Sequence, residues 1–476
     1  MNAVIAVIIH VLAVSASPIS LLVIGSGLLQ NIIYVWQLVL AGRALRRRPP
    51  QAAMGELWRH FADNAPPIAL LVPAFNEEAT VVESVRALLA LQYPNFEIIV
   101  INDGSRDRTL EALIEAFELR PAQRHYELAV PCQAIQEIYI AKNQRRLVVV
   151  DKLNGGKADA LNAGINLARA AIICSIDADS LLEADALLRA VSPFVEDPVS
   201  TVAVGGTIRV ANGCVIEHGQ VVRVELPRNG YALLQTVEYL RAFLMARLAW
   251  SEANCLTIIS GAFGLFRRQA VLDVGGYRLG TVGEDMELVV KIHRFARETG
   301  RDYRIVFVPE PVCWTEVPEN IRDLGRQRVR WQRGALETFF AHFDLLFNPH
   351  YGRVGILGFG SIFLFDVVGP VLETIGYFLI PVFYVLGALS LVYLKAFAAV
   401  SFLFGVVISI GSLALEEAEL RRFPTTQSLM VLLLAAIVEN FGYRQLNNFW
   451  RIKGYWQFLR RRHHWGTMTR RGFHKS

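Results

Sequence analysis

The first 42 residues contain no lysine, arginine, aspartate or glutamate, and this absence excludes an ordinary water-exposed segment. Of the 476 residues in the chain, 53% are hydrophobic and 19% are charged. A bilayer core takes roughly 20 helical residues, so the run predicts one long span, or two short ones divided near Ser17-Pro18. A cleaved signal peptide is the alternative, since small residues surround Ala16, but the apolar run continues well past that point.

The sequence also lacks paired cysteines. Its five cysteines are widely spaced and form no Cys-x-x-Cys motif, so neither a disulfide framework nor a zinc site is predicted, and we expect reduced thiols. The net charge of +5 is modest, and the basic residues gather beside the apolar blocks. Anionic lipid headgroups explain these residues more simply than nucleic acid does, so membrane lipids are expected partners.

Apolar and polar blocks divide the chain into six predicted parts. A basic cluster at Arg43 and Arg46 to Arg48 marks the cytoplasmic side, which predicts a multi-pass protein of the inner (plasma) membrane whose polar middle part is cytoplasmic. The C-terminal block contains about four spans if its first apolar stretch is divided near Pro370. The predicted parts are an N-terminal membrane segment (1–42), a basic linker (43–65), a soluble domain (66–319), amphipathic interface helices (320–353), a membrane block (354–448) and a basic tail (449–476).

The soluble part predicts an α/β fold with a mostly parallel sheet. Four apolar runs read as buried strands and alternate with helical segments; they cover 68–76, 97–105, 146–151 and 171–177. The link from Arg120 to Asn143 breaks this rhythm and is expected to be an irregular or amphipathic insertion. In such sheets ligands bind at the carboxyl ends of the strands, where the polar motifs of this chain stand.

Each of these polar motifs has a structural explanation as well as a functional one. Asp103 in "NDGS" follows a strand, but Asp-Gly-Ser is also an ordinary turn and helix cap. Lys157 in "NGGK" resembles part of a phosphate loop but lacks the GxxxxGK[ST] spacing. In extended chain Asp177 and Asp179 would project to the same side, as two hard oxygen ligands suited to Mg²⁺ or Mn²⁺. Alternatively, this pair caps a helix that begins near Glu183.

Two further motifs lie downstream. Glu284 and Asp285 open an amphipathic helix, where acidic residues are also common because they favour the positive end of the helix dipole. Gln327, Arg330 and Trp331 lie on an amphipathic stretch before the membrane block, which could equally be an interfacial helix with arginines reaching the headgroups.

Taken in order, Asp103, Asp177-x-Asp179, Glu284-Asp285 and Gln327-x-x-Arg330-Trp331 resemble the signature D, DxD, (T/G)ED, (Q/R)xxRW of membrane-embedded family 2 glycosyltransferases. This group includes bacterial cellulose, hyaluronan, chitin-oligosaccharide and poly-N-acetylglucosamine synthases. The segment that begins at Ser260-Gly261 is similar to an acceptor-side segment of the same enzymes, and the resemblance extends over nearly the whole chain. It implies a cytoplasmic GT-A catalytic domain that binds a UDP-sugar.

The resemblance also implies a role for each motif. The role-bearing residues are Asn76, Glu77, Asp103 and Lys157 for the donor nucleotide, Asp177 and Asp179 for Mg²⁺ or Mn²⁺, Asp285 beside Glu284 for general base catalysis, and Gln327, Arg330, Trp331, Ser260 and Gly261 for the acceptor and donor site. Gly283 stands where many relatives have threonine. The short tail leaves no room for a cyclic-di-GMP-binding domain of the kind attached to cellulose synthases.

The implied function is an inverting, processive transferase that extends a β-linked polysaccharide and exports it, and a secretion partner protein is left open. One alternative is a transferase that adds a single sugar to a lipid acceptor. Another is a transporter with a nucleotide-sensing domain. The apolar C-terminal block contains Asp366, Glu373 and Glu439, with Arg444 beyond, and these side chains either line a channel or pair between helices.

Overall fold

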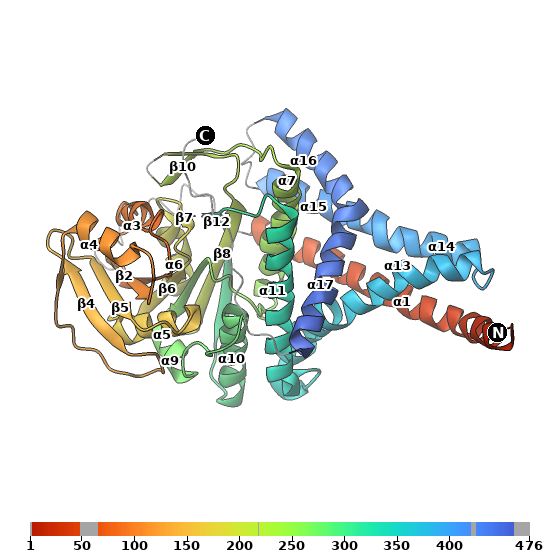
Figure 1. Ribbon diagram of the computed structural model, residues 1–476, viewed down its shortest axis with the longest axis horizontal. Coiled ribbons are helices and arrows are strands. Elements are labelled where there is room, and N and C mark those ends of the chain that lie inside the picture. The colour runs from red at the N-terminus through yellow and green to blue at the C-terminus, as the bar shows by residue number, and fades with distance from the viewer. Residues whose placement is uncertain (1, 48–64, 218, 420–424, 461–476) are drawn as a thin grey trace.

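The computed structural model describes residues 2–47, 65–217, 219–419 and 425–460 (Figure 1). It combines an α/β domain built on one large sheet with a set of long helices on one side of that domain. The predicted basic linker lies mostly outside these residues, as do Arg48 and the basic tail from residue 461 onward.

The sheet has ten strands in the order β3-β4-β5-β2-β1-β6-β11-β8-β12-β7. Its strands are β1 (Ile68–Ala74), β2 (Phe96–Asp103), β3 (Leu119–Pro121), β4 (Ile135–Ala141), β5 (Leu147–Lys152), β6 (Ile172–Ile176), β7 (Ser180–Leu182), β8 (Thr201–Val210), β11 (Phe263–Arg267) and β12 (Arg304–Thr315). The neighbours β5, β2, β1 and β6 are parallel, as are β8 and β12. Antiparallel pairs join the remaining strands, and a separate hairpin is formed by β9 (Val215–Glu217) and β10 (Gln220–Arg223).

The four strands predicted from apolar runs are β1, β2, β5 and β6, and they form the parallel centre of the sheet. Ile98 to Ile101 in β2 have no exposed surface, which explains why these strands are continuously apolar. The expectation of an irregular insertion at 120–143 was wrong in part, because β4 forms there and pairs with β5. β4 is half exposed, so its sequence lacks the apolar run that marks a buried strand.

Helices connect the strands of the domain along the chain. They are α3 (Val81–Leu89), α4 (Thr109–Phe117), α5 (Lys157–Leu167), α6 (Ala186–Glu196), α7 (Gly230–Tyr239), the π-helix η2 (Leu240–Ala246), α8 (Arg247–Glu252), α9 (Arg268–Asp273), α10 (Glu284–Glu298) and α11 (Ile321–Ala341). The predicted cap of a helix by Asp177 and Asp179 is not observed, since α6 begins after Asp185.

Within the described residues, four apolar helices are long enough to cross a membrane: 16–46, 354–385, 391–417 and 426–459. The first lies within α1 (Asn2–Arg46), and the others comprise η5 (Val354–Phe359), α12 (Gly360–Ile362), η6 (Phe363–Val368), α13 (Gly369–Val385), α14 (Leu391–Ala398), η7 (Ala399–Leu403), α15 (Phe404–Glu419), α16 (Thr426–Val438), η8 (Glu439–Tyr443) and α17 (Arg444–Leu459). The C-terminal block thus has three such helices where we expected about four. Pro370 does not divide the first of them, because it lies in the first turn of α13, where a missing N–H is tolerated.

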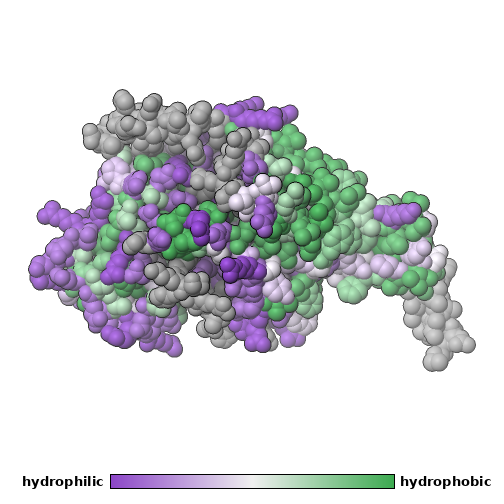
Figure 2. Space-filling view, turned by 90° about the horizontal axis from the view of Figure 1, so that it is seen from above, coloured by the Kyte–Doolittle hydropathy of each residue, from purple (hydrophilic) through white to green (hydrophobic). Residues whose placement is uncertain are grey.

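α1 is one continuous helix, and α13, α14 and α15 pack beside it (Figure 1). Two buried side-chain amides in α1 donate to backbone carbonyls of the π-helical segments η6 and η7: Gln30 Nε2 donates to Leu364 O at 3.3 Å, and Asn31 Nδ2 donates to Val400 O at 3.0 Å. Figure 2 shows apolar surface over this helical region and mostly hydrophilic surface over the sheet domain.

The last two helices, α16 and α17, lie against the sheet domain. Leu432 and Ala436 of α16 pack on Val237 and Leu240 of α7 and η2. Trp450 of α17 belongs to a cluster with Leu324 and Val329 of α11. In Figure 1, α17 runs alongside α11, while α13 and α14 extend away from the sheet.

Candidate active site

Five of the predicted residues meet at the carboxyl edge of the parallel strands. Lys157, the first residue of α5, forms an ion pair with Asp177, which follows β6. Lys157 Nζ also lies 3.5 Å from Glu284 Oε1 and 3.5 Å from the carbonyl oxygen of Gly261. Asp285 Oδ2 accepts a hydrogen bond from Gly261 N at 3.1 Å. Residues from separate parts of the sequence thereby form one charged cluster, which consists of Lys157, Asp177, Gly261, Glu284 and Asp285.

Burial and mutual attraction set the protonation of this cluster. Burial lowers the pKa of Lys157, but the carboxylates of Asp177 and Glu284 outweigh it and hold the pKa above its ordinary value. Burial raises the pKa of Glu284 to about 7; Lys157 opposes this and Asp285 adds to it. Lys157 is therefore a fixed cation, whereas Glu284 titrates near neutrality.

Asp285 is held by backbone amides. Besides Gly261 N, its Oδ1 accepts from Met286 N at 2.8 Å. These two hydrogen bonds from backbone N–H groups orient the carboxylate without neutralising its charge, which suits a group that must accept a proton.

Arg247 at the start of α8 is a cation near Asp285 that sequence reasoning missed. Its guanidinium stacks 3.8 Å above the ring centroid of Phe243, and its Nη1 atom is buried without a hydrogen-bond partner in the described part of the chain. Burial lowers the pKa of Arg247 to about 10, and the charge of Asp285 acts in the opposite direction. No local sequence signal marks this residue, because it reaches the cluster only through the packing of α8.

Asp103 is occupied by the protein itself. Its Oδ1 accepts from Lys152 Nζ at 2.5 Å and from Gly155 N at 3.0 Å, and its Oδ2 accepts from Gly156 N at 2.7 Å. Lys152 is fully buried and also lies 2.6 Å from Asp159. Asp103 therefore anchors the loop that leads to Lys157, a role that its position at the end of β2 did not reveal.

Asn76 and Glu77 join the loops that follow β1 and β2. Asn76 adopts a left-handed conformation with φ 56°, and its Oδ1 accepts from Arg106 N at 2.8 Å. The amide of Glu77 donates to Thr109 Oγ1 at 2.8 Å. This arrangement places both residues at the same sheet edge as Asp103 and outside the Lys157 cluster.

The Asp177-Ala-Asp179 segment forms a turn. Ser180 N donates to Asp177 O at 3.0 Å, and β7 begins immediately afterwards. The prediction that both side chains project to one side of an extended strand was therefore wrong in its geometry. Within the parts of the chain that the structure describes, no three His, Cys, Asp or Glu side chains gather as a metal site.

α11 carries the remaining predicted residues. Gln327 is buried, and its Oε1 has no hydrogen-bond partner among the residues that the structure describes, which leaves one acceptor for a ligand. Trp331 is 42% exposed, with the guanidinium of Arg328 lying 4.3 Å over its ring. Arg330 is partly exposed one residue before this indole. Ser260, just before Gly261, accepts a long hydrogen bond of 3.4 Å from Ala262 N.

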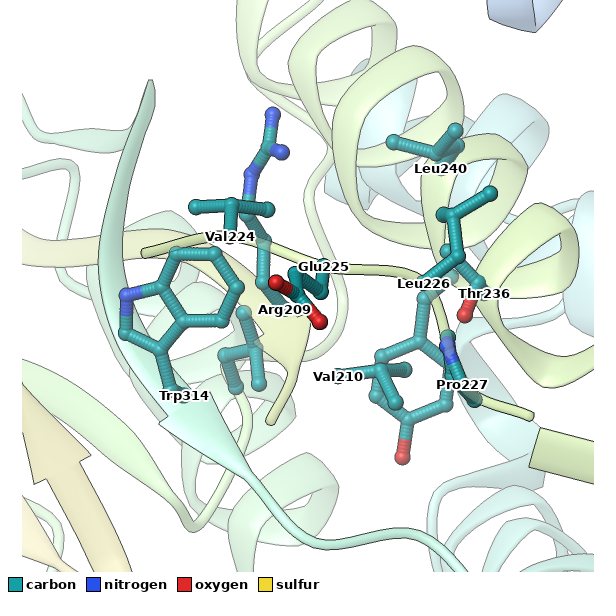
Figure 3. Close-up of a pocket in the computed structure, with 11 residues that line it drawn as sticks. Arg209, Val210, Val224, Glu225, Leu226, Pro227, Thr236, Leu240 and Trp314 are labelled. Carbon is teal, nitrogen blue, oxygen red and sulfur yellow. The ribbon is translucent and has the colours of Figure 1, made fainter. Parts of the chain in front are cut away.

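A small cavity lies away from this cluster, between the end of β8, the segment 224–227, α7 and β12 (Figure 3). Its volume of about 20 Å³ is sufficient for a water molecule but not for a sugar. Arg209 and Trp314 face it, and Arg209 is paired with Glu416 of α15. This cavity is therefore not a donor site.

The three acidic residues noted in the sequence of the C-terminal block are each paired with an arginine. Asp366 lies 2.7 Å from Arg451, and Glu373 lies 3.6 Å from Arg444. Glu439 pairs with Arg241 of η2. Of the two readings left open by the sequence, pairing between helices is the one observed.

A family model described as "Glycosyltransferase like family 2" matches residues 66–334. Poly-beta-1,6-N-acetyl-D-glucosamine synthase from Staphylococcus epidermidis is 32% identical over 276 residues, which are 58% of this chain and 56% of that protein. The protein of the same name from Staphylococcus aureus (strain COL) is 32% identical over 277 residues, 58% of this chain and 56% of that one. The chain thus spans about half the length of the curated relatives it matches.

Among solved structures, the mannosyltransferase PcManGT from Pyrobaculum calidifontis, in complex with GDP-Man and Mn²⁺, is similar with a TM-score of 0.54 and 18% identity; the match covers 94% of this chain and 99% of that chain. Likeness at this identity shows the fold and confirms the expected GT-A architecture. The family match covers more than half of the chain. The chain therefore belongs to glycosyltransferase-like family 2.

Proposed function

We propose that this protein is an inverting glycosyltransferase that moves a sugar from a UDP-sugar to the growing end of a β-linked polysaccharide. The observation that carries the proposal is the charged cluster at the sheet edge, where Lys157, Asp177 and Asp285 meet. Relatives named poly-beta-1,6-N-acetyl-D-glucosamine synthase support UDP-N-acetylglucosamine as the first donor to test.

The donor diphosphate is assigned to the Lys157 side of the cluster. Lys157 is a fixed cation that a diphosphate can draw from Asp177, and the backbone between Gly155 and Lys157 is already ordered by Asp103. Asn76 and Glu77 border the nucleotide side of this edge.

The residues at 177–179 fit a divalent ion in the type of donor they offer. Asp177 and Asp179 provide two hard carboxylate oxygens, and such ions take one or two carboxylates together with substrate phosphates. We assign Mg²⁺ or Mn²⁺ to them; when bound, the ion offsets charge on the departing diphosphate. Asp177 is available to it because Lys157 can turn to the diphosphate.

Asp285 is assigned as the general base. It removes the proton from the acceptor hydroxyl as that oxygen bonds to the anomeric carbon, while the bond from this carbon to UDP breaks. Attack from the face opposite UDP inverts an α-linked donor to a β-linkage. Glu284 lies between Lys157 and Asp285 and adjusts the charge of the site near neutral pH.

The acceptor is assigned to the side of α11. The exposed indole of Trp331 offers a flat surface for a sugar ring, and Gln327 has a free acceptor for a hydroxyl. Arg330 and the Ser260-Gly261 segment complete this side. We infer that the predicted parts of the chain hold except at 448/449, where α17 continues to Leu459, and that the C-terminal helices serve export.

The decisive experiment incubates membranes containing the protein with radiolabelled UDP-N-acetylglucosamine, UDP-glucose or UDP-glucuronate and sizes the product. We expect a polymer from one of them, lost with EDTA and regained with Mg²⁺ or Mn²⁺. A labelled lipid carrying one sugar would replace the proposal with the single-transfer alternative. Absence of transfer from every donor, with UDP still bound, would favour a nucleotide-sensing transporter.

A further inference from the structure

A carboxylate on α11 holds the loop that carries Glu284 and Asp285. Glu337 Oε2 accepts a hydrogen bond from Thr281 Oγ1 at 2.9 Å and another from Val282 N at 3.0 Å. Thr281 Oγ1 in turn accepts from Gly283 N at 3.3 Å. One carboxylate oxygen on a residue that is 55 to 56 positions away from its two partners in sequence thereby fixes the segment that precedes α10.

The same loop touches α11 backbone to backbone. A Cβ atom on Gly283 would lie 2.8 Å from the carbonyl oxygen of Gly334, and one on Gly334 would lie 2.9 Å from Gly283 Cα. Contacts this short leave no room for a side chain on either residue. The close approach of α11 therefore requires glycine at both positions.

Apolar packing continues this contact along α10. Met286 and Val290 of α10 belong to one buried cluster with Phe339 of α11 and Phe359 of η5. Glu337 and the contact between Gly283 and Gly334 hold the loop before α10, and this apolar cluster holds the first turns of α10. The position of Asp285, the second residue of α10, is accordingly set by α11.

We propose that Glu337 is a positioning residue for Asp285: its two hydrogen bonds to the 281–283 loop place the carboxylate where it meets the acceptor hydroxyl. The inference rests on the proposed function, in which Asp285 is the base. A displacement of about 1 Å at a reacting group costs as much as about 100-fold in rate. Glu337 itself does not contact the reacting atoms.

The two oxygens of Glu337 have different partners, so substitutions can test its hydrogen bonds to the loop separately from its negative charge. Both loop bonds go to Oε2, whereas Arg333 Nε lies 3.3 Å from Oε1. In Glu337→Gln the amide oxygen can still accept both loop bonds. In Glu337→Leu a side chain of similar size accepts neither.

The test compares both variants in the full-length, lipid-embedded protein, with kcat and KM for UDP-N-acetylglucosamine, UDP binding and melting temperature as readouts. For Glu337→Leu we expect kcat to fall by about 10- to 100-fold while donor KM and UDP binding stay within about 2-fold. For Glu337→Gln we expect kcat within about 3-fold of the unmodified protein.

Three results would overturn the proposal: an unchanged kcat in Glu337→Leu, a joint loss of kcat, UDP binding and melting temperature, or equal damage in Glu337→Gln. Hydrogen exchange of amides 282–287 gives a readout independent of activity, and we expect faster exchange in Glu337→Leu only. If the unmodified protein transfers no sugar but this exchange pattern holds, the proposed function fails and the loop anchoring stands.

Discussion

Asp285 and Asp103 show two uses of a carboxylate at one edge of the same sheet. The carboxylate of Asp103 is paired with the buried Lys152 and accepts hydrogen bonds from loop N–H groups, so its charge is compensated by the protein itself. Asp285 accepts hydrogen bonds from the backbone N–H groups of Gly261 and Met286 and belongs to the charged cluster whose Lys157 side we assign to the donor. The surroundings of each carboxylate, more than its place after a strand or before a helix, determine what it can do.

The variant Asp285→Asn tests the assignment of the base. Asparagine keeps the size of the side chain and one acceptor oxygen but cannot remove a proton, so we expect sugar transfer to fall by roughly 100- to 10,000-fold. UDP affinity, measured by calorimetry, should stay near its original value because Lys157 and Asp177 are untouched. Transfer at a near-normal rate would rule out Asp285 as the base.

Glu284 should give the protein a pH-dependent stability. Its pKa of about 7 in the folded protein lies above the ordinary value of 4.5, so the folded state binds the proton more tightly than the unfolded state. The resulting stability is complete below the ordinary pKa and is lost as the pH rises through about 7, a change of about 3 kcal/mol at 1.36 kcal/mol per pKa unit.

Melting curves of the lipid-embedded protein between pH 5 and pH 8 measure this effect. Glu284→Gln has no proton to lose there, so it should melt above the unmodified protein at pH 8 and close to it at pH 5. Parallel pH profiles for the two proteins would contradict the buried, titrating state of Glu284.

Among the elements, sequence periodicity predicted those whose burial is continuous. β1, β2, β5 and β6 are apolar runs because both of their faces are covered, and the polar residues at their ends were correctly placed at one edge. β4 was missed because it is half exposed. The turn at Asp177 was predicted as extended chain, because the hydrogen bond from Ser180 N to Asp177 O that defines the turn leaves no signal in the sequence.

Long-range contacts account for the rest of the candidate site. The approach of Gly283 to Gly334 and the place of Arg247 depend on how α11 and α8 dock. Neither helix carries a local signal for its partner. Lys152 likewise looks like an ordinary polar residue at the end of β5, although it is buried between two carboxylates.

Lys152 gives a prediction about β5 and the loops that it joins. Lys152→Met should destabilise the protein by about 3–5 kcal/mol, because Asp103 and Asp159 remain as buried charges without their cation. Adding Asp159→Asn should restore part of that loss. Melting temperature and protease resistance of the purified protein report both steps, and a single variant as stable as the original would contradict the buried ion pairs.

At the scale of the whole molecule, the C-terminal block returns to the catalytic domain. Glu416 of α15 pairs with Arg209 of β8, and α16 and α17 then pack on α7 and α11. We infer that α13 leaves the membrane face of the catalytic domain, that α14 and α15 come back, and that α16 and α17 stay beside the domain. The turn between α13 and α14 then faces the opposite side of the membrane.

Cysteine labelling tests this topology. Ser390, in the α13–α14 turn, and Gln427, in the first turn of α16, are both exposed and serve as a matched pair for replacement by cysteine. The partly exposed Cys132 and Cys214 are first changed to serine. A membrane-impermeant maleimide added to intact cells should label Ser390→Cys and leave Gln427→Cys unlabelled, and labelling of both would show that α14 and α15 do not return to the side of the sheet domain.

The side-chain hydrogen bonds of Gln30 and Asn31 in α1 imply an order of events during synthesis. Gln30 and Asn31 find their carbonyl partners at residues 334 and 369 positions later in the chain. At about 5–20 residues per second, roughly 20–70 s separate the emergence of α1 from the last of these partners. Throughout this interval the whole catalytic domain is synthesised and can fold while the first helix waits in the bilayer with two polar side chains unsatisfied. The completed bundle is thus a late product of translation, formed around an enzyme domain that is already present.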